Sequence, residues 1–273
     1  MTVDLRKPTR HDTPIHLVSA AGLPAALKAA PAATRRWLEA TGFTAKPHTH
    51  ALLPGADGAL AQVWAGVEPG GAWPLAALAA ELPAGRYAID PDGLQPDPEA
   101  AAMSWTLGRY RFSRYKPAPR AAGAPVLALP ASDAARRGLR LAEAIAATRD
   151  LVNTPAEHLG PAELGAAVRE VAKAHGAKLR EVVGEALLRQ RLPAIHAVGR
   201  AAARAPRLIE LNWGDPAHPR LAIVGKGVCF DTGGLDLKTA TGMRWMKKDM
   251  GGAASALALA RLVMAERLPV RLQ

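Results

Sequence analysis

The spacing of apolar residues along the chain predicts a series of amphipathic helices. From Leu141 to Val152, four side chains recur at steps of four, three and four, which places them on one helical face. Ser132 is a suitable N-cap for this helix, and Pro155 ends it because a proline pushes the preceding residue out of the α region. Similar spacing predicts further helices at residues 34–41, 75–82, 161–175 and 251–266.

Short apolar runs between these helices predict strands. Helices that alternate with apolar strands indicate an α/β fold, in which helices cover both faces of a sheet. The predicted strands are residues 61–67, 106–112, 194–199, 207–213, 220–226 and a last one beginning at Pro269.

A stretch rich in proline and small residues, Pro117–Asp133, is typical of a connection between domains. It predicts an N-terminal α/β domain at residues 1–118, a linker and connecting helix at 119–152, and a second domain at 153–273. No internal repeat is visible in the sequence.

The composition is consistent with this organisation. The 273 residues suffice for two cores, and 49% are hydrophobic but only 4% aromatic, which favours helices packed on a sheet. The single cysteine, Cys229, excludes a disulfide framework and fits a reducing compartment. The sequence shows neither an apolar run of about 20 residues nor a secretory signal, so we expect a cytoplasmic protein without a membrane anchor.

The net charge of +11 raises the question of a nucleic-acid partner. The most suggestive patch is Arg109–Lys116, which alternates basic and aromatic residues. We interpret it as a strand with Tyr110 and Phe112 facing inward, and the alternative is a platform on which bases stack. Basic side chains spread over solvated faces explain the charge without a nucleic acid.

Charge and glycine are concentrated between Val224 and Ala254. A phosphate-binding P-loop does not fit, because Arg220 stands in place of its first glycine and Gly227 follows the lysine. A dinucleotide-binding fingerprint does not fit either, because Phe230 replaces its third glycine.

The charged side chains of this stretch could instead hold metal ions. Lys226 follows a predicted strand, where α/β proteins place functional groups, and Asp231 and Asp249 follow it. Carboxylates suit hard divalent cations, and a lysine amine binds a metal only in its neutral form. The alternative is a surface loop of mixed charge. His48 and His50 lack a third ligand nearby and are interpreted as structural or solvated.

The segments "VGKGVCFDTGGLDLK" and "KKDMGGAA" closely resemble the signature of the leucine aminopeptidase family, which are cytosolic dinuclear metallo-exopeptidases. "DLVNTPAEHLGP" and "AVGR" resemble its catalytic domain, and "LGRYRFSRYK" resembles the close of its N-terminal domain. The resemblance implies a small N-terminal α/β domain and a mixed-sheet α/β catalytic domain with helices on both faces. It covers most of the chain from Trp105 onward and, more weakly, the residues before it.

The resemblance also implies roles for individual residues. Lys226 and Asp249 would bind one metal ion and Asp231 would bridge two, with zinc or manganese as the ions. Lys238 would be the catalytic lysine that stabilises the oxyanion, and Met246 would line the pocket for the first side chain of the peptide substrate. The reaction would be hydrolysis of the N-terminal peptide bond of leucine-like substrates.

Several neighbours of these residues receive no role in the chemistry. The pattern gives Asp236 no ligand role. Cys229 and Trp245 are interpreted as packing residues, and His158 and His196 as structural.

The family's second motif, N-T-D-A-E-G-R, does not occur before Gln273. We therefore expect a truncated catalytic domain that binds metal weakly, lacks appreciable peptidase activity and dissolves poorly. Family members form hexamers, which we expect of the intact enzyme only. One alternative is a non-catalytic relative that acts in binding or assembly. Another is a nucleic-acid-binding protein, a hypothesis that is supported by the net charge alone.

Overall fold

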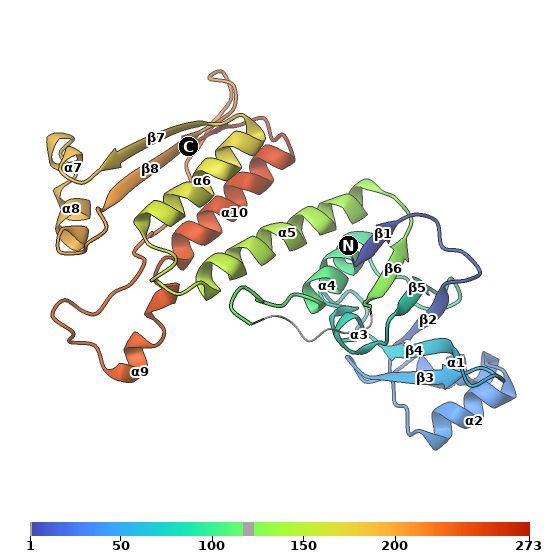
Figure 1. The fold of residues 1–273 in the computed structure, drawn as a ribbon. Coiled ribbons are helices and arrows are strands. Elements are labelled where there is room, and N and C mark those ends of the chain that lie inside the picture. The colour runs from blue at the N-terminus through green and yellow to red at the C-terminus, as the bar shows by residue number, and fades with distance from the viewer. Residues whose placement is uncertain (1, 117–122) are drawn as a thin grey trace. The chain divides into compact units, whose positions relative to one another are not determined.

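A computed structural model describes residues 2–116 and 123–273 (Figure 1). The chain divides into two compact units, Met1–Ala142 and Glu143–Gln273. Helix α5 (Asp133–Asn153) begins in the first unit and ends in the second. The Ser132 hydroxyl accepts a hydrogen bond from the Ala135 amide at 3.1 Å, which confirms the predicted N-cap.

Within the described residues, the first unit contains a six-stranded sheet with the order β1-β6-β5-β2-β4-β3. All neighbouring strands run parallel except the edge strand β3, which pairs antiparallel with β4. The strands are β1 (Val3–Leu5), β2 (Thr13–Val18), β3 (His50–Pro54), β4 (Leu60–Gly66), β5 (Gly85–Ile89) and β6 (Pro125–Leu129).

Helices cover both faces of this sheet, because alternate side chains of a strand point to opposite sides. Ile15 and Leu17 of β2 belong to one cluster, which includes Trp105 and residues of α3 and α4. Val18 and Trp64 belong to a second cluster, which includes residues of α1 and α2. The helices are α1 (Leu23–Ala29), α2 (Ala32–Ala40), α3 (Ala76–Glu81) and α4 (Pro98–Gly108).

Two expectations for the first unit are wrong. The predicted strand at residues 106–112 begins inside α4, whose N-cap Asp97 accepts a hydrogen bond from the Ala100 amide at 3.0 Å. The helix continues to Gly108, where a Cβ atom would overlap the Ala76 backbone. Residues 125–129, expected in the connection between domains, form β6, which lies between the edge strand β1 and β5, and residues 117–122 lie outside the described residues.

The second unit has a mixed arrangement of strands. β7 (Lys178–Val183) pairs antiparallel with β8 (Arg207–Asn212), and β9 (Arg220–Leu221) pairs parallel with β10 (Arg271–Leu272). A bridge between Trp213 and Leu272 links the two pairs. The helices of this unit after α5 are α6 (Pro161–His175), α7 (Ala186–Arg189), α8 (Pro193–Gly199), α9 (Ala240–Met243), the short 3-10 helix η1 (Met246–Lys248) and α10 (Gly251–Ala265).

Helices α6 and α10 lie side by side and pack on these strands (Figure 1). Leu211 and Leu272 from the strands share a cluster with Ala172 of α6 and Val263 of α10. Gly176 ends α6 in the left-handed conformation, with a φ of 66°, and the helix has the bounds 161–175 that its spacing predicts. A smaller cluster of Leu159, Leu164, Met250 and Ala254 fixes the start of α10.

Two predicted strands of the second unit are also corrected. Residues 194–199 form helix α8, which Pro193 opens because a proline suits the first helical turn. Of residues 220–226, only Arg220 and Leu221 form a strand. The Ile223 amide donates to the Gln273 carbonyl at 2.9 Å, which extends the pairing with β10 by one residue, and the Lys226 carbonyl accepts from the Ala253 amide of α10 instead.

Candidate metal centre

Backbone contacts hold Lys226 against the start of α10. The Ala253 amide donates to the Lys226 carbonyl at 2.8 Å. A Cβ atom on Gly225 would lie 2.5 Å from the Gly252 carbonyl oxygen, so only glycine permits this approach. The end of the extended segment and the beginning of the helix are thus joined directly.

This junction brings Lys226 and Asp249 together. The Lys226 ammonium donates to Asp249 Oδ1 at 2.7 Å, with the two side chains 58% and 18% exposed. The second oxygen, Asp249 Oδ2, is buried and has no hydrogen-bond partner in the described structure. A buried carboxylate oxygen without a partner is costly, and a cation would satisfy it.

Asp231 and Lys238 form a second pair in the same loop. Lys238 Nζ lies 2.7 Å from Asp231 Oδ2 and 2.9 Å from the Met246 sulfur. The turn between them closes through a hydrogen bond from the Lys238 amide to the Thr232 carbonyl at 3.0 Å. Gly233 makes this turn possible, with a φ of 82° that favours glycine.

The electrostatics of the loop favour an ionised carboxylate at Asp231. Its pKa is lowered first by the hydrogen bond from Lys238 and next by that from the Gly233 amide at 2.8 Å. The charge of Lys226 lowers it further, so both lysines act on this carboxylate. The predicted site residues therefore form two ion pairs, Lys226–Asp249 and Lys238–Asp231, and the charge of Lys226 also acts on Asp231. Met246 contacts the second pair through Lys238.

The candidate donors are one amine and two carboxylates. No group of three or more His, Cys, Asp or Glu side chains in residues 2–116 and 123–273 could hold a metal ion. A lysine amine is an uncommon ligand, so the site depends on Lys226 as well as on Asp231 and Asp249. The unpartnered oxygen of Asp249 is the observation that most favours a bound cation.

The neighbouring residues differ in their surroundings. Asp236 adopts a left-handed conformation with a φ of 58°. Cys229 packs against the cluster around Met250, and burial, followed by the charge of Glu163, raises the pKa of its thiol to about 11. The expectation that Trp245 is a packing residue is wrong, because this side chain is 62% exposed and lies near Lys248.

No role is assigned to Lys247 from the sequence, but its side chain makes a specific contact in the structure. Its ammonium donates to the Asn153 carbonyl at 3.1 Å, at the end of α5. The sequence shows two adjacent lysines before Asp249, Lys247 and Lys248, and nothing in it distinguishes them. In the structure it is Lys247 whose ammonium reaches the end of α5.

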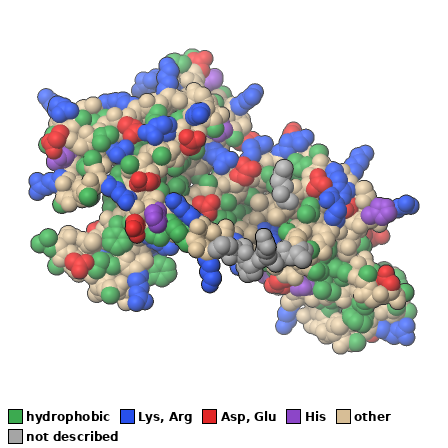
Figure 2. Space-filling view, in the orientation of Figure 1, with side chains coloured by type: hydrophobic (Ala, Val, Ile, Leu, Met, Phe, Trp, Pro, Cys, Tyr) green, Lys and Arg blue, Asp and Glu red, His purple; other side chains and the backbone are tan. Residues whose placement is uncertain are grey.

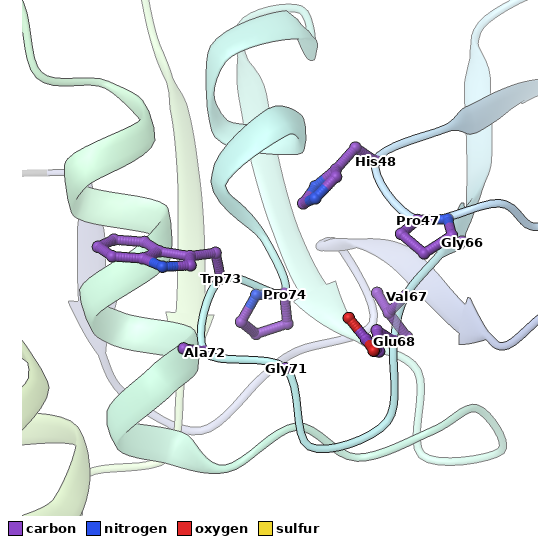
Figure 3. A pocket seen from close by; sticks show the side chains of 9 residues that line it. All are labelled: Pro47, His48, Gly66, Val67, Glu68, Gly71, Ala72, Trp73 and Pro74. Carbon is purple, nitrogen blue, oxygen red and sulfur yellow. The ribbon is translucent and has the colours of Figure 1, made fainter.

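The histidines make contacts that fit structural roles. His196 lies 3.0 Å from Glu185, and His50 lies 3.4 Å from Glu81. His48 lines a cavity of about 90 Å³ in the first unit, into which its ring and the Glu68 carboxylate point (Figure 3). None of the predicted metal or catalytic residues lines this cavity.

Two family models together match most of the chain. The M17 aminopeptidase N-terminal domain matches residues 13–130, and the cytosol aminopeptidase catalytic domain matches residues 146–273. The chain belongs to the M17 cytosol aminopeptidase family. The resemblance that the glycine-rich signature carries is thereby confirmed.

Individual M17 relatives agree with this assignment. A probable cytosol aminopeptidase of Rhodococcus opacus is 38% identical over 186 residues, which are 63% of this chain and 37% of that protein. The crystal structure of the cytosol aminopeptidase from Coxiella burnetii has a TM-score of 0.91 at 41% identity and covers 99% of this chain. The bottromycin maturation enzyme BotP, in complex with Mn, has a TM-score of 0.79 at 31% identity and covers 96% of this chain.

The matched relatives are considerably longer than this chain. The chain spans 37% of the Rhodococcus opacus protein, and 59% and 58% of the Coxiella burnetii and BotP structures. No helix among the described residues has the length and apolar character needed to cross a membrane.

Proposed function

We propose that this chain carries part of the metal centre of a leucyl-type aminopeptidase, which hydrolyses the N-terminal peptide bond of peptides. Lys226 and Asp249 would help hold one divalent ion, Asp231 would contribute to holding two, and the ions would be manganese or zinc. The observation that carries the proposal is the unpartnered, buried Asp249 Oδ2 beside the amine of Lys226. The related enzyme BotP, whose structure is a complex with Mn, supports the choice of metal.

The proposed site residues other than the metal ligands have distinct roles. Bound divalent ions would supply Lewis acidity, which polarises a carbonyl and makes water more acidic. Lys238, whose ammonium reaches 2.7 Å to Asp231, would stabilise the negative oxygen that develops as the scissile carbonyl becomes tetrahedral. Met246 adjoins Lys238 and would contact the apolar side chain of the N-terminal residue.

We further propose that residues 1–273 alone bind metal weakly and turn over little substrate. Two divalent ions require more donors than one amine and two carboxylates supply. Among the described residues, no cluster of acidic, histidine or cysteine side chains adds to this set. A hexamer of the intact enzyme and a cytoplasmic location complete the proposal, and the names of the relatives support the location.

Calorimetric titration with Mn²⁺ tests the metal centre directly. The wild-type chain should bind Mn²⁺, and Asp249→Asn should weaken binding at least about ten-fold because it removes a charged ligand. Asp236→Asn is the matched control, since it removes the same charge from the same loop and asparagine tolerates a left-handed conformation. Absence of Mn²⁺ binding by the wild type, or equal effects of the two variants, would contradict the proposal and favour a non-catalytic relative.

An activity assay tests whether residues 1–273 alone turn over substrate. With Mn²⁺ and leucine p-nitroanilide, residues 1–273 should show no turnover typical of a peptidase. Turnover on the order of 1 s⁻¹ or more would show that these residues suffice for catalysis.

A further inference from the structure

We propose that Lys247 is a positioning residue that fixes Asp249 for metal binding, by fastening the turn η1 to the end of helix α5. This inference rests on the proposed metal centre and extends it to a residue outside the candidate ligand set. Both segments lie within the second unit.

The first observation is the contact itself. Lys247 Nζ donates to the Asn153 carbonyl at 3.1 Å, across 94 positions of the sequence. Asn153 is the last residue of α5, and the final carbonyls of a helix have no partner within the helix. They also carry the negative end of the helix dipole, so a cation is the favoured partner there.

The second observation is that the opposite end of the turn is fixed as well. Met250 follows Asp249 and is fully buried in the cluster with Leu159 and Leu164. Val152, one residue before Asn153, packs against the same cluster. Asp249 is therefore held between an ion–dipole contact at Lys247 and an apolar anchor at Met250.

The third observation is that η1 has little structure of its own. It contains three residues, and the Asp249 amide closes it with a hydrogen bond of 3.2 Å to the Met246 carbonyl. A segment this short depends on its attachments for a fixed conformation. Loss of the Lys247 contact would free Met246 and Asp249 together.

The adjacent lysine provides a matched control. Lys248 is exposed, and its ammonium lies 5.6 Å from the centre of the exposed Trp245 ring. It has the same charge and composition as Lys247 and lies one position closer to Asp249. A general effect of positive charge near the site would therefore appear equally in Lys248 variants.

Amide hydrogen exchange of the metal-free chain tests the anchoring. Lys247→Met should raise the exchange rates of residues 246–250 at least about ten-fold, whereas Lys248→Met should leave them at the wild-type rates. Unchanged exchange in Lys247→Met would overturn the inference whatever the metal does. If Lys247→Met does not fold, as judged by circular dichroism, Lys247→Gln takes its place.

Titration with Co²⁺ tests the effect on the site, because its visible absorption reports the geometry of the ligands. Lys247→Met should bind Co²⁺ about 10- to 100-fold more weakly and with an altered spectrum, as expected when a contact that orients a ligand is lost. Lys247→Arg, which can still donate to Asn153, should restore both, and Lys248→Met should behave as wild type.

The outcomes separate this inference from the proposed function. If the wild type does not bind Co²⁺ or Mn²⁺, the metal centre fails while the exchange result still decides the anchoring. If the wild type binds and Lys247→Met binds equally well with the same spectrum, the positioning role is overturned and the metal centre stands.

Discussion

Asp12, near the start of β2, keeps a buried negative charge in the first unit. Its side chain is 1% exposed and accepts hydrogen bonds from Arg6 at 2.5 Å and from the Thr9 amide at 2.7 Å. Burial raises the pKa of Asp12, but the bonds from Arg6 and Thr9 outweigh it and lower the pKa from 3.8 to about 2. The charged form is therefore more stable in the folded state than in the unfolded chain.

This shift predicts a defined pH dependence of stability. A lowered pKa contributes stability that is fully present above pH 3.8 and is lost as the pH falls through about 2. Asp12→Asn should lower the free energy of unfolding of the first unit by about 2 kcal/mol at pH 7. The difference from wild type should shrink below pH 4, as measured by urea unfolding at several pH values.

The exposed Asp92 provides the control for this prediction. Asp92→Asn should change the free energy of unfolding by less than about 0.5 kcal/mol. A constant difference between Asp12→Asn and wild type from pH 7 to pH 2 would contradict the assigned cause.

At the same scale, the resemblance marked the candidate site residues and grouped Lys226 with Asp249, but it did not pair Lys238 with Asp231. The motif marked Lys226, Asp231, Lys238 and Asp249, and the structure places each lysine against one carboxylate. Which lysine meets which carboxylate depends on the turn at Gly233 and on the approach of the Lys226 backbone to α10. The Lys226–Asp249 contact spans 23 positions and the Asp231–Lys238 contact only 7, yet both depend on a backbone path that the residue pattern does not specify.

The approach of the extended segment to helix α10 gives a prediction at the scale of elements. Gly225→Ala would place a methyl group 2.5 Å from the Gly252 carbonyl oxygen, and backbone cannot yield as a flexible side chain does. We expect a loss of about 1–3 kcal/mol in the stability of the second unit, because the close contact must open.

Gly227 lies two positions further along the same segment and serves as the control. A Cβ atom there would meet Leu164 at 3.4 Å, an ordinary van der Waals contact. Gly227→Ala should therefore cost less than Gly225→Ala when both are measured by thermal unfolding. Equal losses of stability would show that the segment tolerates no added side chain at either position, and that the close contact of Gly225 with the Gly252 backbone is not the cause.

The secondary structure was predictable where the periodicity was long and failed where it was short. The spacing from Leu141 to Val152 extends over three turns, and α5 forms as predicted. Residues 194–199 offered only six positions, too few to separate a strand from a helix, and Pro193 decided for the helix. The prediction at 106–112 missed the N-cap at Asp97, which starts a helix that continues through Leu107.

At the scale of the whole molecule, each unit has cores of its own. The first unit buries side chains on both faces of its sheet, and the second unit contains two further clusters. We expect two thermal transitions in calorimetry, with Asp12→Asn lowering only one and Gly225→Ala lowering only the other. A single transition that both substitutions shift equally would show that the units unfold together.

The exposed apolar residues of the candidate site loop predict self-association. Leu235 is 93% exposed and Leu237 is 78% exposed, in the same loop as Val224 and Phe230. Exposed apolar side chains favour association, so replacing both leucines by serine should raise the concentration at which light scattering appears. Val198→Ser, at an exposed residue of α8, should have the smaller effect.

The charge distribution explains why composition alone could not assign a partner. Lys and Arg side chains are spread over the visible face of each unit, with acidic groups among them (Figure 2). Several of the arginines are paired with carboxylates, as Arg207 is with Glu181 at 3.0 Å. The excess of 11 positive charges, which is 35 Lys and Arg minus 24 Asp and Glu, remains after such pairing, but its distribution among acidic groups on this face is not the basic stripe expected of a nucleic-acid-binding surface.

The pairing of β1 with β6 has a consequence for co-translational folding. Val3 lies opposite Leu127 in the finished sheet, so β1 has no partner until the chain has been synthesised as far as β6. At bacterial or eukaryotic elongation rates this delay lasts on the order of ten seconds. During that interval β1 must stay unpaired, and slowing translation before Leu127 would lengthen its exposure to chaperones and proteases.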